Sequence, residues 1–209
     1  SRTTGGSSGG AVAAAALGMG VLHTGTDAGG SVRIPASFTG VFSLKPTYGK
    51  VPAWPASPFG TLSHTGPITR TVRDAAAMLN VMARPDIRDW TALPVDDTNY
   101  LEGIEHGVEG LRIAFSLTLG HVKIVNPDIA ELVTAAAQSF EKLGATVEEG
   151  DPDLADAESI FRTHWFASAA AADKSVPVDK RYLLDQGLRK IMERGRNVAA
   201  ADYIEAASG

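Results

Sequence analysis

The sequence predicts an α/β fold in which a mixed sheet is flanked by helices. A strand at 111–115, a helix capped by Asn126 and a strand at 145–147 have the order and spacing of a parallel crossover. Short apolar runs at 21–22 and 41–44, bounded by glycine or proline, predict two further strands. An apolar content of 44% is ordinary for a packed core, so we expect a globular protein.

The N-terminal half contains signals for two helices and a long loop between them. The alanine-rich run at 11–17 is a strong helix former. The chain is rich in proline over 46–67, which predicts a loop. Thr71 and Asp74 have the spacing of a helix N-terminal cap, and Pro85 follows the end of that helix. Three aromatic side chains are expected to anchor the loop: Tyr48, Trp54 and Phe59.

The C-terminal half is predicted to be helical on either side of the crossover. Pro127 stands at the first position of the crossover helix, and Gly144 closes it. The polar segment 86–110 predicts a surface connection. Further helices are expected over 153–171, over 180–194 and from 200 onward.

Composition excludes several classes of function. The formal charge is −5 with acids and bases interspersed, which leaves no basic stripe for nucleic acid and no cationic face for a membrane. The absence of cysteine excludes disulfides, thiolate metal sites and a cysteine nucleophile. No apolar run is long enough for a membrane span, and no signal peptide or metal-ligand spacing is found. We expect a cytoplasmic protein that takes a small molecule, with no metal, no cofactor, no nucleic acid and no membrane as partner.

Glycine and serine are concentrated at the N-terminal end, where half of the 22 glycines lie within the first 50 residues. Gly29 and Gly30 precede Ser31, so consecutive backbone N–H groups can converge beside the Ser31 hydroxyl with no Cβ in the way. Acyl transfer needs a nucleophile and N–H donors for the oxyanion. The segment therefore predicts the nucleophile half of a serine-hydrolase site.

These glycine-serine blocks resemble the amidase signature family, the serine hydrolases that use two serines and a lysine. Gly-Gly-Ser-Ser-Gly-Gly stands at 5–10, and Gly-Thr-Asp-x-Gly-Gly-Ser-x-Arg stands at 25–33. Leu-Lys-Pro-Thr-Tyr-Gly at 44–49 and Gly-Pro-Ile-Thr-Arg at 66–70 follow in the family's order. The similarity is dense over 4–79 and weaker through the later crossover. It implies an amidase-signature-like core.

The resemblance also implies a role for each matching residue. Ser31 attacks the substrate carbonyl to form an acyl-enzyme, and Ser7, which follows a cis peptide bond from Gly6, relays the proton. The oxyanion would be held by the backbone N–H groups of Ala28, Gly29, Gly30 and Ser31. The site would be supported by Gly6, Thr26, Asp27 and Arg33.

One element of the family's site has no match. The family's general base is a lysine well upstream of the relay serine, and only six residues precede Ser7 here. We therefore expect the lysine to lie outside this chain and the core to be incomplete at both ends. Residues 1–209 are taken as part of a single domain, with the catalytic serine region at 1–84 and the strand-helix-strand and helical remainder at 111–209. We expect the complete enzyme to hydrolyse linear amides, with a homodimer left open, and this chain alone to be inactive.

Several alternatives stay open at the level of the sequence. The same loop could serve a catalytically silent module that binds carboxylates or a partner protein. An amidotransferase A subunit is a second family assignment, although Arg33-Ile34-Pro35-Ala36 is more similar to the stand-alone amidases. Residues 6–10 also fit the nucleophile elbow of an α/β-hydrolase, with Ser8 as nucleophile. Trp165 and Phe166 fit either a pocket wall or a helix core.

Overall fold

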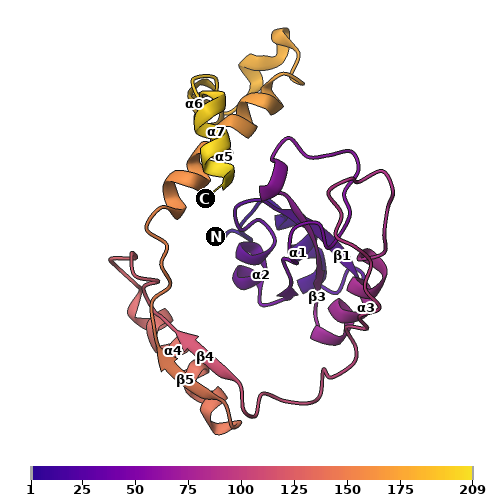
Figure 1. The fold of residues 1–209 in the computed structure, drawn as a ribbon, viewed down its shortest axis with the longest axis vertical. Helices are drawn as coiled ribbons and strands as arrows, with labels where there is room; N and C mark the ends of the chain where they lie inside the picture. The colour runs from indigo at the N-terminus through magenta and orange to yellow at the C-terminus, as the bar shows by residue number, and fades with distance from the viewer. Residues whose placement is uncertain (1, 209) are drawn as a thin grey trace.

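Two small sheets and the helices around them make up the structure, a computed structural model that describes residues 2–208 (Figure 1). The N-terminal part holds a three-stranded antiparallel sheet, and a parallel pair of strands follows later in the chain. The predicted α/β class is confirmed. Its strands are divided between these two sheets within the described residues.

The central strand of the first sheet is β3 (His64–Thr69), with β1 (His23–Asp27) and β2 (Phe42–Ser43) on its two sides. Both neighbours run antiparallel to β3. Gly66 is required in β3, because a Cβ there would collide with the carbonyl oxygen of Leu44. The close approach lets the Leu44 N–H donate to the Pro67 carbonyl at 3.2 Å.

Helices α1 (Gly9–Ala16) and α2 (Arg33–Thr39) build the core of the N-terminal part against β3. The alanine run predicted as a helix therefore does form one. The small side chains let the two helices approach each other and the sheet closely. Helix α3 (Val72–Met82) packs against β3 and β2, on the other side of β3 from α1 and α2 in Figure 1. The buried cluster consists of Val12, Ala15, Val32, Ala36 and Ile68.

Two predicted helix caps are present. The Thr71 hydroxyl accepts a hydrogen bond from the Asp74 N–H at 3.1 Å and opens α3. The Asn126 side chain accepts from the Asp128 N–H at 2.9 Å and opens α4 (Pro127–Lys142). These signals are local in sequence, so they act regardless of what the helix later packs against.

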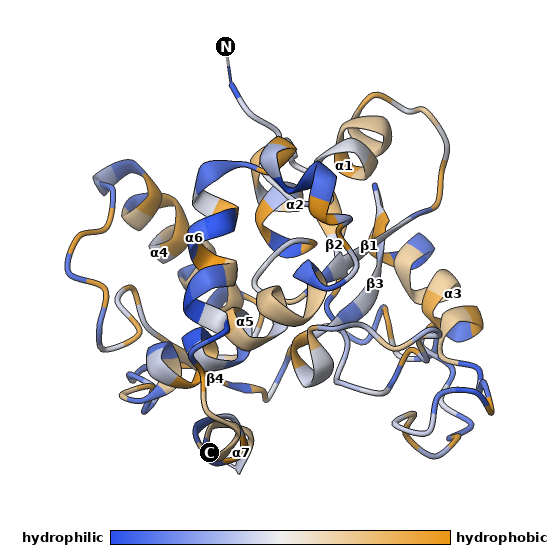
Figure 2. Ribbon diagram, turned by 90° about the horizontal axis from the view of Figure 1, so that it is seen from above, coloured by the Kyte–Doolittle hydropathy of each residue, from blue (hydrophilic) through white to orange (hydrophobic). Residues whose placement is uncertain are grey.

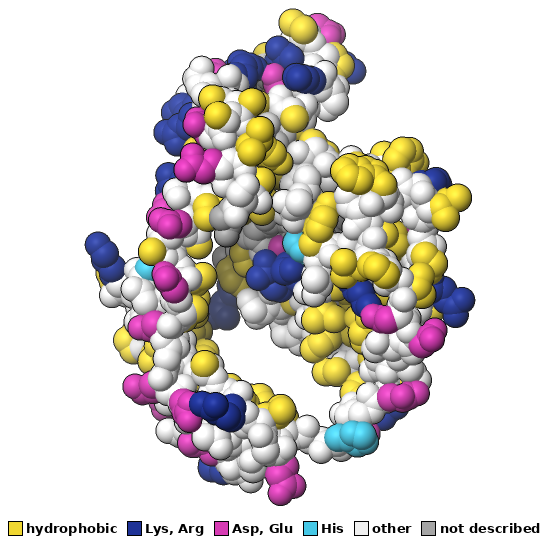
Figure 3. Space-filling model, in the orientation of Figure 1, with side chains coloured by type: hydrophobic (Ala, Val, Ile, Leu, Met, Phe, Trp, Pro, Cys, Tyr) yellow, Lys and Arg dark blue, Asp and Glu magenta, His cyan; other side chains and the backbone are white. Residues whose placement is uncertain are grey.

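The predicted parallel crossover is confirmed. Strand β4 (Arg112–Phe115) pairs in parallel with β5 (Thr146–Glu149), and α4 connects them. Much of the apolar face of α4 is exposed, as the hydrophobic side chains on this arm of the molecule in Figure 3 illustrate. Leu132, for example, keeps 65% of its surface exposed, whereas Ala137 is buried.

The remaining helices form a bundle that returns toward the N-terminal part (Figures 1 and 2). Helix α5 (Ala157–Asp173) packs against α6 (Gln186–Gly195) and α7 (Ala200–Ser208). The buried Asp173 carboxylate pairs with Arg196 at 2.6 Å and with Arg181 at 3.4 Å, which fixes the end of α5 to the segments that follow. Two short 3-10 helices, Gly60–Leu62 and Val178–Leu183, complete the regular elements of the described residues.

Several sequence predictions are wrong in their bounds, among them the helix predicted over 153–171, which spans Ala157–Asp173. The strand predicted at 21–22 begins only at His23, and Val21 and Leu22 are both more than half exposed. The loop predicted over 46–67 ends at Ser63, because its last residues belong to β3. The helix predicted over 180–194 is interrupted, since Asp185 caps a separate α6.

Pairing between distant segments explains the errors at β1 and β3. The register of β1 is set by its ladder to β3, in which Gly25 lies opposite Gly66. Proline is disfavoured in a central strand because it lacks an N–H, and Pro67 therefore suggested a loop.

None of the helices between residues 2 and 208 is long and apolar enough to span a membrane.

The core predicts a clear difference between two isoleucine truncations. Ile68→Ala removes a fully buried side chain from β3 and should destabilise the protein by about 2–5 kcal/mol. Ile87→Ala is the matched control, because Ile87 is fully exposed and its loss should change stability by about 0.5 kcal/mol or less. Denaturant unfolding of both variants measures the difference. Equal losses of stability would show that Ile68 does not lie in the core.

Candidate active site

Asp27, the last residue of β1, is the centre of the glycine-serine loop. Its side chain is only 1% exposed. It accepts backbone hydrogen bonds from Gly30 at 2.7 Å, from Val32 at 3.2 Å and from Arg33 at 3.4 Å. The Arg33 guanidinium adds two more, at 2.9 Å from Nε and 3.0 Å from Nη2. A single carboxylate therefore fixes the backbone on both sides of Ser31.

These contacts keep the Asp27 carboxylate ionised. Burial by itself raises the pKa of the carboxyl group. The hydrogen bond from Arg33 and those from the Gly30 and Val32 N–H groups outweigh burial, and they lower the pKa from 3.8 to about 2. Arg33 remains about half exposed, so its outer face is hydrated while its inner face neutralises Asp27.

Gly30 lets the loop turn sharply. Its φ of +107° lies in a region that side chains with a Cβ rarely adopt, and a Cβ would also lie 2.5 Å from Ile34 Cδ1. The Gly30 N–H is taken by Asp27. By contrast, the N–H groups of Ala28, Gly29 and Ser31 donate to no acceptor among the described residues. Three donors of the same loop thus remain for a ligand.

The first glycine-serine block lies directly against this loop. The Gly6–Ser7 peptide bond is cis, as the family resemblance implies. The Ser8 N–H donates to the Ser31 carbonyl at 3.2 Å and joins the two blocks. The Ser8 hydroxyl donates to the Thr26 carbonyl at 3.4 Å, so it is directed at β1. Residues 2–7 form no strand, and the nucleophile elbow centred on Ser8 therefore lacks the strand that it needs.

A cleft of about 510 Å³ brings the two serines together. Ser7, Thr26, Ala28 and Ser31 all line it, whereas Ser8 does not. Thr65 lies opposite Thr26 in the β1–β3 ladder and forms part of the same wall. The volume is typical of a small-molecule site. The rest of the lining comes from Pro52, Ala53, Trp54, Pro55, Ser57, Phe59, Ser63 and Trp165.

The other predicted site residues surround the cleft without lining it. Gly6 directly precedes Ser7, and a Cβ built on Gly29 would lie 3.1 Å from Phe161 Cζ of α5. Asp27, Gly30 and Arg33 form the hydrogen-bonded support described above.

Aromatic rings on one side of the cleft come from parts of the chain far apart in sequence. The Phe59 and Trp165 ring centroids are 4.9 Å apart, and Phe161 stacks on Trp165 at 5.5 Å. Of the two interpretations of Trp165, the pocket wall is correct, while Phe166 instead packs near Arg194. Helical spacing in the sequence could not show this, because α5 meets the loop only in the folded protein.

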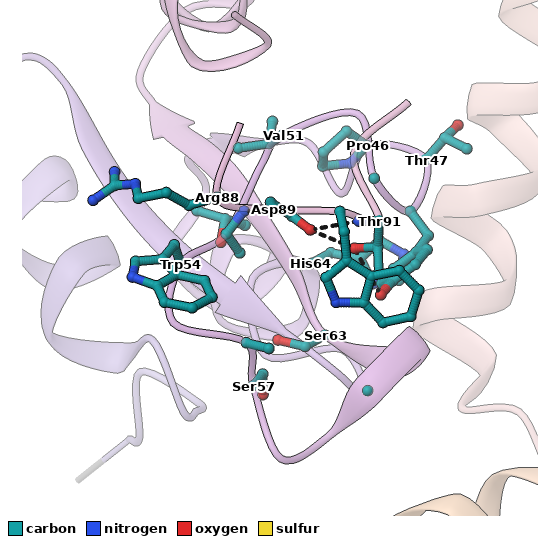
Figure 4. A pocket seen from close by; sticks show the side chains of 17 residues that line it. Pro46, Thr47, Val51, Trp54, Ser57, Ser63, His64, Arg88, Asp89 and Thr91 are labelled. Carbon is teal, nitrogen blue, oxygen red and sulfur yellow. Dashed lines mark hydrogen bonds between the residues drawn. The ribbon is translucent and has the colours of Figure 1, made fainter. Parts of the chain in front are cut away.

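A second cavity of about 160 Å³ adjoins the cleft and shares Trp54, Ser57 and Ser63 with it (Figure 4). Its other walls include His64 and Val51. The Asp89 carboxylate is held in place in this cavity, because it accepts from the Thr91 hydroxyl at 2.6 Å and from the Ala53 N–H at 2.8 Å. We assign it no catalytic group.

The described lysines do not supply a base to the cleft. None of them is among its lining residues. Lys45 donates to the Pro46 carbonyl at 3.0 Å, and its pKa is lowered by burial and by the nearby Arg33, against an opposing effect of Asp27. Residues 2–208 also contain no cluster of three or more histidine and carboxylate side chains that could hold a metal ion.

Comparisons with known proteins show what the whole chain is similar to. The amidase family model matches residues 1–207. The A subunit of glutamyl-tRNA(Gln) amidotransferase from Rubrobacter xylanophilus is 46% identical over 150 residues, which cover 71% of this chain and 31% of that protein. The chain thus spans about a third of this relative's length.

Solved structures of similar proteins superpose on nearly the whole chain. A bacterial aryl acylamidase of the amidase signature family superposes with a TM-score of 0.86 and 31% identity, over 97% of this chain and 44% of that one. The A subunit of glutamyl-tRNA(Gln) amidotransferase from Thermotoga maritima superposes with a TM-score of 0.73 and 33% identity, again over 97% and 44%.

The depressed pKa of Asp27 predicts an acid-dependent loss of stability. Since the folded-state pKa of about 2 is below the ordinary 3.8, the ionised carboxylate stabilises the fold fully at pH values above 3.8. That contribution, about 2 kcal/mol, should be lost as the pH falls toward 2. Denaturant unfolding at several pH values between 6 and 2 measures it.

The control uses two asparagine variants. Asp27→Asn should remove this part of the pH dependence, whereas Asp97→Asn, at an exposed position, should retain it. A pH dependence that is the same in Asp27→Asn as in the wild type would contradict the assignment.

Proposed function

The chain belongs to the amidase signature family, and from this premise we propose that it supplies the nucleophile of an amidase, with Ser31 forming the acyl-enzyme. The Ser31 Oγ attacks the carbonyl carbon of a carboxamide, and its proton passes through the Ser7 hydroxyl to the leaving nitrogen. The C–N bond breaks and the amine departs. Water then attacks the acyl ester, which releases a carboxylic acid and regenerates Ser31.

The observation that carries this proposal is the set of unbonded backbone donors in the loop that brings Ser31 to the cleft. Three backbone N–H groups, those of Ala28, Gly29 and Ser31, have no acceptor among the described residues. Donors fixed before the reaction can stabilise a developing oxyanion at no cost of reorganisation. The Gly30 N–H supports this arrangement indirectly, because it ties the loop to Asp27.

We propose that the general base comes from outside the described residues. Its absence from the cleft lining and the longer chains of the relatives both support this assignment. The family resemblance implies a lysine upstream of Ser7. On this proposal residues 1–209 form one part of a single amidase-signature domain, and the complete site requires the rest.

An amidotransferase A subunit is the second candidate. The 46% identity to the Rubrobacter xylanophilus protein favours it. Both candidates need the same acyl-enzyme step, so they differ in substrate and in partner proteins. The chemistry at Ser31 is common to them.

Covalent labelling tests the nucleophile. In the full-length natural protein that carries this sequence, a fluorophosphonate probe should form an adduct on Ser31, located by peptide mass spectrometry. The adduct should disappear in Ser31→Ala and persist in Ser8→Ala, since the Ser8 hydroxyl is bonded to Thr26. An adduct on Ser8 would falsify the assignment.

The relay role of Ser7 has a separate kinetic test. Ser7→Ala should lower kcat by about 10²- to 10⁴-fold, as expected for the loss of a proton-transfer group. Ser8→Ala, the neighbouring serine outside the cleft, should stay within a few-fold of wild type. Turnover numbers and pH–rate profiles of both variants in the full-length protein decide the matter, and near-wild-type turnover by Ser7→Ala would rule out the relay.

A further inference from the structure

Aromatic and proline side chains give the Ser31 cleft a large flat apolar surface. Trp54 and Phe59 reach it from the long loop, and Trp165 reaches it from α5. The rings of Phe59 and Trp165 are tilted by 48° at a centroid distance of 4.9 Å. Rings in this arrangement favour a flat apolar ligand group, through stacking and edge contacts in addition to burial.

This surface begins at the loop that carries the nucleophile. A Cβ placed on Gly29 would lie 3.1 Å from Phe161 Cζ and 3.5 Å from Trp165 Cζ3, so both rings of α5 lie close to the backbone two residues before Ser31. Because Ser31 and Trp165 line the same cleft, a substituent on a carbonyl carbon that Ser31 attacks can lie against Trp165. The Trp165 ring can therefore contact that substituent directly.

The described residues that line the cleft include no charged side chain. Apart from the tryptophan N–H groups, the polar side chains among the described lining residues are hydroxyls of serine and threonine. The nearby Asp27 carboxylate is already bonded to Arg33 and to three backbone N–H groups. An ionised group taken out of water without an opposite charge is strongly disfavoured. A ligand with an α-ammonium and an α-carboxylate group thus has no charged partner in this lining.

From these three observations we propose that the Ser31 cleft selects neutral amides that bear an aromatic or similarly flat apolar group next to the scissile bond. The inference rests on the proposed amide hydrolysis at Ser31 and specifies its substrate class. Trp165 and Phe59 are then the side chains that determine specificity. The hydroxyls of Ser57, Ser63 and Thr65 provide neutral hydrogen-bonding partners around the amide.

Four amides distinguish this substrate class from its alternatives in the full-length natural protein. Benzamide carries the ring on the acyl side, acetanilide carries it on the amine side, acetamide has no ring, and glutamine carries two charges. We expect kcat/KM for at least one of the two aromatic amides to exceed that for acetamide and that for glutamine by about tenfold or more. The better aromatic amide identifies which side of the carbonyl faces Trp165.

Matched tryptophan variants then test whether the preference for aromatic amides depends on Trp165. Trp165→Ala should reduce kcat/KM for the preferred aromatic amide by about 10- to 100-fold, mainly through KM, and reduce that for acetamide by a clearly smaller factor. Trp165→Phe should restore most of the loss because it retains an aromatic ring. Trp90→Ala is the control, since Trp90 is 89% exposed and does not line the Ser31 cleft. Should Trp165→Ala not fold, Phe59→Leu takes its place with the same expectation.

The outcomes separate this inference from the proposed function. Faster hydrolysis of glutamine or acetamide than of both aromatic amides, together with fluorophosphonate labelling of Ser31, would overturn the substrate class and leave the amidase intact. Equal losses on acetamide and on the aromatic amide in Trp165→Ala would also overturn it. No hydrolysis of any amide and no labelling of Ser31 would overturn both proposals.

Discussion

The structure around the site depends on one buried carboxylate. Asp27 accepts hydrogen bonds from three backbone N–H groups and from Arg33, all within six residues of it in sequence. Leaving this carboxylate without partners in the protein interior would be strongly unfavourable, so the loop has to wrap around it. The wrapping turns the chain at Gly30 and leaves the N–H groups of Ala28, Gly29 and Ser31 unbonded among the described residues. The backbone donors available for a ligand therefore result from the way in which the loop hydrogen-bonds the Asp27 carboxylate.

The cleft is assembled from four segments, and each contributes a different property. The loop before α1 brings Ser7, and the loop after β1 brings Ser31. The ladder between β1 and β3 sets Thr65 beside Thr26, which places the long loop next to the loop that carries Ser31. Helix α5 supplies Trp165 from much later in the chain. The two serines therefore come from loops next to the small sheet, whereas the aromatic rings come from the long loop and from a helix outside the sheet.

The sequence predicted the elements whose signals are local. Thr71 and Asn126 cap the expected helices, because a cap is an interaction between residues two or three positions apart. The crossover from β4 to β5 was likewise readable from its helix and its two short apolar runs. Strand β1 was misplaced by two residues, because His23–Asp27 has no apolar alternation and forms a strand only through its pairing with β3. Strand β3 was predicted as a loop for the same reason. Proline is disfavoured in a central strand, and the sequence alone did not show which strands pair with β3.

The sequence alone determined the family resemblance and singled out Ser7 and Ser31, since glycine-serine blocks of this kind are constrained by backbone geometry over a few residues. It also singled out Asp27 and Arg33 as supports. Only the tertiary structure decided that Ser8 faces β1, that the Gly30 N–H is occupied by Asp27, and that Trp165 reaches the cleft. Each of these depends on contacts between segments that are separate in the chain, or on the direction in which a loop turns. Neither is encoded in spacing or composition, because both are set by packing and by the need to satisfy buried polar groups.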